Sequence, residues 1–430
     1  VRRGTASVYN TTMARSTSVL VLVSVLVLML VHPAVLQCVT GDDANMKFTE
    51  DNRLQLLDSE MQFSLELLQK VNSLHPSDNI FLSPSSVYNA LLLAYFVSAN
   101  HTEASMKQAL YLPENQDKLD TLGAYQLEKY YQKLRAFKNS LNYQLSSANR
   151  MFISNEQNVR PCMMKLFNDE IEMADFTNNL TATVGRINSW VSGETRNNIN
   201  DLLSSDSLTS NTNLVLVNAA YFRGLWKNQF SPSDTKETEF KTANGTNVPV
   251  MMMSIESEFS HLLEEKLEAD VLELPYEGDN ISLFILMPLD PSPTAIQVLL
   301  NKTDTNILRD IINRTYTISN QVSVAIPKFS SDQSLELTPV LESMGIGDLF
   351  ESSADLSTLT GAPGLRLDSV IHKAKITVDE EGTEASAATA IFANRFAVNS
   401  FIANRPFVYF LLEKKLNMIL FVGVFNSPDT

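Results

Sequence analysis

The stretch VDEEGTEASAATA, residues 378–390, decides the fold, and it lies close to the carboxyl terminus. An acidic pair and a glycine precede a run of small residues that are mostly uncharged. In an extended chain, alternate side chains share a face, so one face would carry Thr383, Ala385, Ala387, Thr389 and Ile391. Gly382 supplies a pivot with unrestricted backbone angles. The pattern predicts a loop that can enter a β-sheet as a strand, although this composition is also typical of a solvated linker.

Further motifs favour the strand-forming loop over the linker. They occur in order along the chain: NIFLSPSS at 79–86, INSWV at 187–191, INDLL at 199–203, VNAAYFRGLW at 217–226, LPY at 274–276, IPKF at 326–329 and RPF at 405–407. Their order and spacing resemble those of the serpin family, and the resemblance covers roughly Asp58 to Pro428. Each match is weak by itself, but their collinearity makes the resemblance specific.

The resemblance implies an α+β, single-domain fold. Helices would surround a large central mixed β-sheet, with two smaller sheets and an exposed reactive-centre loop at about residues 380–405. It also implies a proximal hinge of the inhibitory type, formed by Glu380, Glu381, Gly382, Thr383, Glu384, Ala385, Ser386, Ala387, Ala388 and Thr389. By the same resemblance, Ser83, Ser86, Asn218 and His372 form a polar latch under the central sheet, and Trp226 lies where insertion begins.

The amino-terminal region has the layout of a secretory signal peptide. Residues 1–12 precede the first methionine and look like translated upstream sequence. Met13-Ala14-Arg15 and the apolar run 19–31 then predict a signal at 13–38, because the run is too short to span a bilayer. We therefore expect a secreted, extracellular protein whose serpin domain comprises residues 39–430. An uncleaved signal anchor is the alternative.

Only two cysteines exist, Cys38 and Cys162. If cleavage falls at or after Cys38, the secreted chain keeps one cysteine and has no internal disulfide. Cys162 is then either buried and inert or an intermolecular thiol, and its apolar neighbours favour burial. Secretion is also consistent with the six glycosylation sequons that lie beyond the predicted signal, of which Asn280 abuts a strand-like run and is the least suited to carry a glycan. They are Asn100, Asn179, Asn244, Asn280, Asn301 and Asn313.

The net charge limits the kinds of partner that the protein can bind. The formal net charge is −16, and loss of the first 38 residues removes three arginines and no acid, which gives −19. We therefore expect a monomer that binds no nucleic acid and, once the signal is removed, no membrane. One basic helix-like segment could bind a polyanion weakly, although a solvated helix face is the simpler interpretation. It carries Lys129, Lys133, Arg135 and Lys138.

The sequence predicts neither an enzyme nor a cofactor site. It has five histidines but no HExxH, no GxSxG and no Cys/His cluster at metal-ligand spacing. Gly345-Ile346-Gly347 is followed by Phe350, so no GxGxxG loop is present. The chain carries 44% hydrophobic residues and has no Pro/Gly/Ser-rich linker or internal repeat, which is consistent with one large core.

In the mechanism that the resemblance implies, a serine protease attacks the loop, forms an acyl-enzyme ester and is trapped when the cleaved loop inserts as a new strand. Counting forward from Gly382 by the commonest family loop length reaches Phe396, whereas counting back from Pro406 reaches Arg395. We prefer Arg395, because the resemblance includes secreted serpins with a hinge one residue shorter, one of which carries an arginine at this position. Its guanidinium matches the buried acid of a trypsin-like pocket, whereas Phe396 would suit a chymotrypsin-like pocket.

We therefore expect a secreted suicide inhibitor of a trypsin-like serine protease. The overall layout looks like that of an arthropod extracellular serpin, which implies haemolymph or saliva and a role in innate immunity through melanisation, Toll activation or clotting. The alternative is a non-inhibitory serpin that acts as a carrier or binding protein.

Overall fold

The computed structural model describes residues 38–40, 43–138, 143–382 and 399–428. Over these ranges the longer helices are α2 (Glu50–Leu74), α3 (Pro84–Val97), α4 (Asn100–Ala109), α5 (Lys118–Lys138), α6 (Pro161–Leu166), α7 (Leu180–Glu194), α8 (Ala295–Lys302), α9 (Thr305–Thr315), α10 (Thr338–Leu341) and α11 (Ser357–Thr360). The strands are β1 (Ile80–Leu82), β2 (Tyr143–Ser154), β3 (Ile171–Ala174), β4 (Leu214–Gly224), β5 (Lys236–Lys241), β6 (Asn247–Glu264), β7 (Ala269–Pro275), β8 (Ile281–Pro288), β9 (Asn320–Pro327), β10 (Phe329–Glu336), β11 (Ser369–Val378), β12 (Asn399–Ile402), β13 (Phe407–Glu413) and β14 (Met418–Phe425).

The central sheet is mixed and has the strand order β10-β11-β4-β2-β3. The middle pair, β11 and β4, is parallel, with Ser369–Ile376 in register with Val215–Phe222. β10 pairs with β11 and β2 pairs with β4 in the antiparallel sense, and β3 adds to β2 in parallel. The parallel pair in the middle matters for function, because a strand placed between β11 and β4 could be antiparallel to both.

The remaining strands form one continuous hydrogen-bonded path instead of two separate sheets. Its order is β1-β14-β13-β8-β7-β6-β9-β12, with β5 paired to β6. The long strand β6 is shared, since residues 260–264 pair with β7 and residues 252–259 pair with β9. The predicted α+β, single-domain fold is confirmed, and the two smaller sheets are joined through β6.

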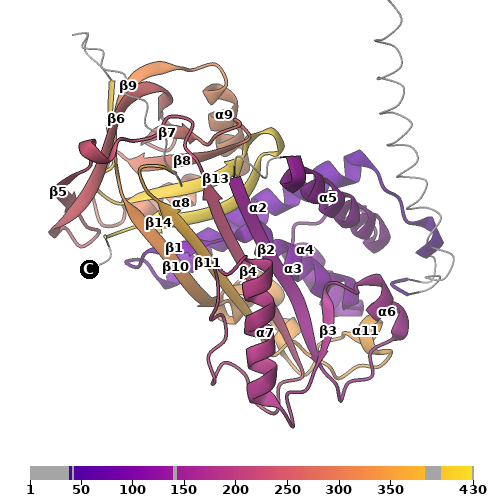
Figure 1. Ribbon diagram of the computed structural model, residues 1–430. Helices are drawn as coiled ribbons and strands as arrows, with labels where there is room; N and C mark the ends of the chain where they lie inside the picture. The colour runs from indigo at the N-terminus through magenta and orange to yellow at the C-terminus, as the bar shows by residue number, and fades with distance from the viewer. Residues whose placement is uncertain (1–37, 41–42, 139–142, 383–398, 429–430) are drawn as a thin grey trace, which may run out of the picture.

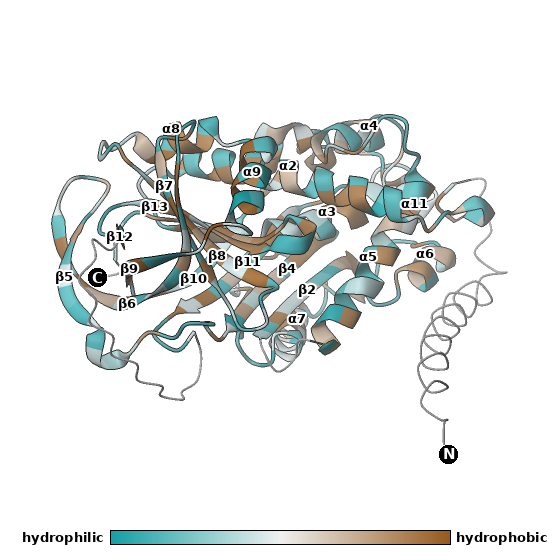
Figure 2. Cartoon of the chain, turned by 90° about the horizontal axis from the view of Figure 1, so that it is seen from above, coloured by the Kyte–Doolittle hydropathy of each residue, from teal (hydrophilic) through white to brown (hydrophobic). Residues whose placement is uncertain are grey.

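The central sheet is buried on both faces because β4 alternates between two apolar layers. Val215 and Val217 contact the cluster under α7, which includes Ile187 and Val191. The opposite face of the sheet joins the largest core cluster, which contains the buried faces of α2 and α3. Figure 1 shows α7 in front of the sheet and α3 behind it. The interior strands are largely hydrophobic, whereas the peripheral strand β5 is largely hydrophilic (Figure 2).

Local signals in the sequence set the helix that supports the sheet. Ser83 is the N-cap of α3, and its hydroxyl accepts a hydrogen bond from the amide of Ser86 at 3.4 Å. Pro84 occupies the first turn, where it costs no hydrogen bond. Serine at the N-cap satisfies an amide that the helix cannot. The SPSS motif therefore fixes where α3 begins, directly beneath β4 and β11.

Candidate functional site: a central sheet held closed by a polar latch

Four predicted latch residues lie together beneath the parallel pair β4 and β11. His372 and Asn218 are partners in the β11/β4 register, so both side chains extend from the same face of the sheet. The Nδ1 of His372 hydrogen-bonds the side-chain carbonyl of Asn218, and His372 Nε2 accepts from the Ser83 amide at 3.0 Å. The Asn218 amide donates to the Ser86 hydroxyl at 2.7 Å. The network joins β4, β11 and α3, so it must open when the two strands separate.

The latch holds His372 in its neutral form. The side chain is fully buried, and burial lowers its pKa from 6.5 to about 3. Because Nε2 accepts from a backbone amide, the ring proton lies on Nδ1, where it donates to Asn218. A second proton would leave Nε2 facing the Ser83 amide, donor against donor. The native state therefore strongly disfavours protonation of His372.

Two latch members were missed by the sequence analysis. Ser147 lies 2.6 Å from the Ser86 hydroxyl, and the Asn149 carbonyl accepts from Ser86 and from Asn218. Both residues belong to β2, where Asn149 is the register partner of Asn218. Polar residues at alternate positions of a strand usually mark a solvated face, so the pattern SSAN at 146–149 gave no distinctive signal.

The loop leaves β11 through a tight turn against Trp226. The indole Nε1 donates to the Asp379 carbonyl at 2.8 Å, and the Trp226 amide donates to the Glu381 carbonyl at 3.3 Å. Trp226 is 2% exposed, and its ring stacks on Tyr276 with centroids 4.2 Å apart. Trp226 therefore closes the end of the β4/β11 pair at which a loop arriving from β11 would enter.

Only glycine fits at position 382 of this turn. Its φ is +72°, and a β-carbon there would lie 2.3 Å from the Trp226 amide nitrogen and 2.6 Å from the Gly224 carbonyl oxygen. Both neighbours are backbone atoms, which cannot move aside without displacing the chain. Glycine is required here because the backbone at position 382 lies close to the end of the sheet, and because its φ is positive.

The hinge carboxylate Glu380 is anchored to two neighbouring connections, the one between β9 and β10 and the one that leads into β5. Lys328 Nζ donates to it at 2.6 Å, and the Thr235 hydroxyl donates at 2.8 Å. Burial by itself would raise the pKa of Glu380, but hydrogen bonds from Lys328, the backbone and Thr235 outweigh burial and lower that pKa below its ordinary value. Glu380 is therefore ionised at neutral pH and fixes the start of the loop.

The rest of the predicted loop lies outside the described residues. This applies to Thr383, Glu384, Ala385, Ser386, Ala387, Ala388 and Thr389 of the hinge and to Arg395 and Phe396 of the reactive site. The described chain resumes at Asn399 in β12, which pairs in parallel with β9. The scissile bond thus stays a prediction from the sequence.

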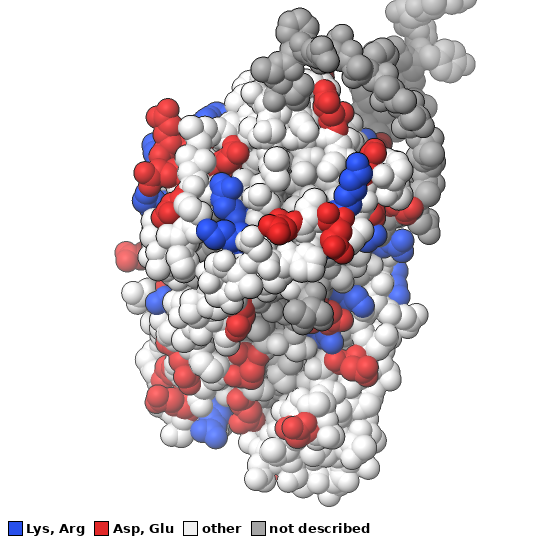
Figure 3. Space-filling view, turned by 90° about the vertical axis from the view of Figure 1, so that its left-hand side faces the viewer, with Lys and Arg blue, Asp and Glu red and all other residues white. Residues whose placement is uncertain are grey.

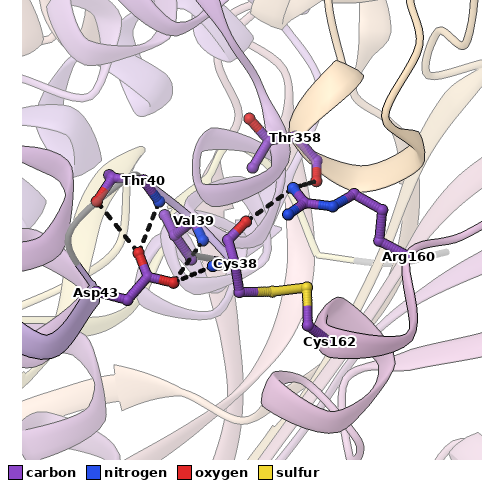
Figure 4. Close-up of a disulfide and its surroundings, with 7 residues drawn as sticks. All are labelled: Cys38, Val39, Thr40, Asp43, Arg160, Cys162 and Thr358. Carbon is purple, nitrogen blue, oxygen red and sulfur yellow. Dashed lines mark hydrogen bonds between the residues drawn. A yellow bond between two sulfur atoms is a disulfide. The ribbon is translucent and has the colours of Figure 1, made fainter. Parts of the chain in front are cut away.

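The expectation that the secreted chain has an unpaired Cys162 is wrong for this structure. Cys38 and Cys162 form a disulfide with their α-carbons 5.8 Å apart (Figure 4). Cys38 is 1% exposed, and the Asp43 carboxylate accepts hydrogen bonds from the amides of Cys38, Val39 and Thr40. The expectation of an unpaired Cys162 followed from placing the end of the predicted signal at Cys38, which would remove the partner of Cys162.

The predicted glycosylation and polyanion sites are surface features of unequal exposure. Asn100, Asn179, Asn244, Asn301 and Asn313 are exposed, whereas Asn280 is half-buried and accepts from Lys415 at 3.2 Å.

In the basic helix α5, Lys129 pairs with Glu170, and Arg135 pairs with Glu128 and Glu413. Lys133 and Lys138 are exposed. Half of the predicted polyanion cluster is therefore committed to internal carboxylates.

Neither a metal cluster among the described residues nor an extended basic area on one face of the molecule offers an alternative site. The face that presents β5 and β6 mixes acidic and basic side chains without an extended basic area (Figure 3). Within the described ranges, no group of three or more His, Cys, Asp or Glu side chains could hold a metal ion. None of the helices described is long and apolar enough to cross a membrane.

The site thus consists of a buried polar latch beneath a central pair of parallel strands and a tight glycine turn at one end of that pair. Comparison with known proteins identifies the class of this protein. The sequence model of the family described as "Serpin (serine protease inhibitor)" matches residues 58–428. The chain belongs to the serpin family, as the sequence predicted, and its class is that of serine-type endopeptidase inhibitors and not of enzymes.

Relatives and solved structures agree with the family assignment. The chain is 34% identical over 400 residues to serine protease inhibitor 88Ea of Drosophila melanogaster, an alignment that covers 88% of this chain and 92% of the fly protein. It is 33% identical to the leukocyte elastase inhibitor of Sus scrofa, which covers 87% of this chain and all of the pig protein. The crystal structure of maspin has a TM-score of 0.79 at 26% identity and covers 88% of this chain and 100% of maspin.

Proposed function

We propose that this serpin is a secreted inhibitor that traps a trypsin-like serine protease as a suicide substrate. The protease forms an ester with the loop, and the cleaved loop then inserts between β4 and β11 before the ester is hydrolysed. The observation that carries the proposal is the parallel pair β4/β11, closed only by side chains and hydrogen bonds, with Gly382 at the end where the loop begins. A strand folded back from β11 would be antiparallel to both neighbours, the more stable pairing.

Insertion must outrun hydrolysis, so the inward face of the loop has to enter the sheet without a large desolvation penalty. Thr383, Ala385 and Ala387 are small and uncharged. A charged residue at an inward position would cost several kcal/mol on burial. The driving energy is stored in a native state that persists for kinetic reasons. The latch around His372 would contribute to that barrier, because its hydrogen bonds join β4, β11 and α3 and must break before the strands separate.

The choice of target rests on Arg395. A guanidinium donates two parallel hydrogen bonds to a carboxylate, which suits the acidic specificity pocket of trypsin-like proteases. Cleavage after Phe396 would instead indicate a chymotrypsin-like target. The chain would act as a monomer that forms a covalent acyl complex with its protease.

Secretion is supported by the disulfide and by the surface sequons. Disulfides persist mainly in oxidising compartments, and Cys38–Cys162 joins segments 124 residues apart. We place the signal cleavage before Cys38, so that the mature chain keeps this bond. The five exposed sequons would carry glycans. We further propose an extracellular proteolytic cascade of arthropod haemolymph, such as an innate immune cascade, on the strength of the fly relative.

Weak polyanion binding through α5 stays within the proposal in reduced form. Only Lys133 and Lys138 of the four predicted cations are exposed and outside the ion pairs described above. Heparin titrated at low and physiological salt should bind weakly and lose its affinity as salt screens the patch.

The test of inhibition substitutes the two faces of the hinge separately. Thr383→Arg places a charge on the inward face, so trypsin should cleave this variant without forming an SDS-stable complex. Glu384→Arg places the same charge on the outward face and should retain the complex. Equal complex formation by both variants, measured as moles of inhibitor consumed per mole of protease, would show that burial of the inward face is not required for trapping. Cleavage of the unsubstituted protein without any complex would favour a carrier.

A further inference from the structure

We infer that the Cys38–Cys162 disulfide, together with Arg160, is a clasp that resists opening of the central sheet at the end remote from the loop. The inference rests on the proposed function, because it concerns the strand insertion by which the protease is trapped. The clasp is drawn in Figure 4. It joins the connection between β2 and β3 to the amino-terminal strap, which we define as residues 38–40 and 43–49.

Arg160 extends the clasp to a third segment. Its Nη1 donates to the Cys38 carbonyl and to the Thr358 carbonyl, each at 2.9 Å, and its own amide donates to the Leu359 carbonyl at 2.9 Å. Thr358 and Leu359 belong to α11, which lies in the chain just before β11. The clasp therefore binds the β2–β3 connection both to the strap and to the segment that leads into β11.

The strap itself is seated on the body of the protein. It crosses α5 at Gly123, where a β-carbon would lie 2.0 Å from the Lys47 carbonyl oxygen. Lys47 also pairs with Asp120 at 3.5 Å, and Cys38 and Val39 belong to the largest core cluster. The strap continues into α2, which packs on α3 and α5. A pull on Cys38 is therefore resisted by contacts beyond the disulfide.

Insertion must move the two sides of the clasp relative to each other. The sheet order places β4, β2 and β3 on one side of the new strand and β11 and β10 on the other. Making room for one strand separates β4 from β11 by about a further 4.8 Å, the spacing of neighbouring strands. The β2–β3 connection travels with the first group, whereas α11 leads into the second. Opening of the whole sheet thus strains the clasp.

The reach of a disulfide is short compared with that movement. The α-carbons of Cys38 and Cys162 are 5.8 Å apart, and bonded cysteines rarely exceed about 6.8 Å. The connection can therefore move by about 1 Å before the strap must follow or the Arg160 hydrogen bonds must break. The clasp acts late in insertion, since it lies beside the start of β11 whereas the loop enters beyond the other end, at Gly382.

Peptide annealing to the unreacted protein measures sheet opening without a protease. β11 has ten residues, so the peptide TEASAATAIF, residues 383–392, can pair along its full length. TEASAA, residues 383–388, reaches only the end near Trp226. Native gels and the combined fluorescence of Trp190 and Trp226 would follow incorporation of each acetylated peptide into the wild type and into three variants. The variants are Cys38→Ser/Cys162→Ser, Arg160→Gln and, as a matched control, Leu308→Ala.

Loss of the clasp should raise the rate at which the long peptide anneals and should leave the rate for the short peptide nearly unchanged. We expect annealing of TEASAATAIF to rise by about fivefold for each hydrogen bond or tether removed, while TEASAA changes by less than twofold. Arg160→Gln keeps the disulfide, so it tests the clasp even if the double serine variant does not fold. Leu308→Ala creates a cavity in α9, away from the central sheet, and should leave both rates unchanged.

Three results would overturn the inference. Equal annealing rates of TEASAATAIF in the wild type, the double serine variant and Arg160→Gln would show that the clasp does not resist opening of the sheet. An equal acceleration by Leu308→Ala would show that general destabilisation suffices. A wild-type protein that takes up neither peptide would instead refute the proposed strand insertion, and the clasp with it.

Discussion

Acidification should weaken the latch through His372, by an amount that follows from its burial. Its pKa falls from 6.5 to about 3 in the native protein, so between these values the unfolded chain binds more protons. The contribution of His372 to the free energy of unfolding is therefore fully present above about pH 6.5, and it declines as the pH falls below that value. At pH 5 the loss is about 2 kcal/mol relative to pH 7.5, or about 30-fold in the unfolding equilibrium, and its ceiling is about 5 kcal/mol below pH 3.

The variant His372→Gln isolates this contribution. The glutamine carbonyl can accept from the Ser83 amide and its amide can donate to Asn218, so the latch contacts persist without a titrating group. Urea unfolding, followed by tryptophan fluorescence at pH 7.5 and pH 5, gives the free energy of the first transition. The wild type should lose about 2 kcal/mol more than the variant across this interval.

Other buried carboxyls, such as Glu60, with a pKa raised to about 8 by burial, titrate equally in both proteins. The difference between the two pH dependences therefore reports His372 alone. If the wild type and His372→Gln lose the same free energy between pH 7.5 and pH 5, the neutral, buried histidine does not control the latch, and our reasoning about the tautomer fails.

Gly382→Ala should lower the free energy of unfolding by about 2 kcal/mol, because the added methyl group meets the backbone of Trp226 and Gly224 at a positive φ; an unchanged urea midpoint would contradict the tight turn. Cys38→Ser/Cys162→Ser should lower the unfolding free energy by up to about 5 kcal/mol, the chain-entropy value for a loop closed across 124 residues. Mass spectrometry of tryptic peptides before and after reduction checks that bond, and two free thiols in the native secreted protein would contradict it.

Much of the site could be predicted because its residues are dictated by close packing. The SPSS motif at residues 83–86 must place a serine N-cap under the sheet, and Gly382 must fit against backbone. Both constraints act over a few residues and leave a local pattern. The resemblance to serpins then assigned Asn218 and His372 to the same network, which the register of β4 and β11 explains.

The parts that were missed depend on contacts between distant segments. Ser147 and Asn149 join the latch only because β2 pairs with β4. The sequence of a strand of small polar residues does not indicate which strand it pairs with. The disulfide depends on the strap reaching α6, over a separation that no short pattern records. The shared strand β6 was likewise missed, since one long strand and two short ones have the same alternation.

Reaction with trypsin tests the central claim most directly. The secreted protein would be mixed with active trypsin, the products separated in SDS and the small released fragment weighed. We predict an SDS-stable complex and a fragment that begins at Phe396, which would establish both trapping and cleavage after Arg395. Complete cleavage without a complex, by trypsin and also by chymotrypsin, would contradict strand insertion as the function of this sheet.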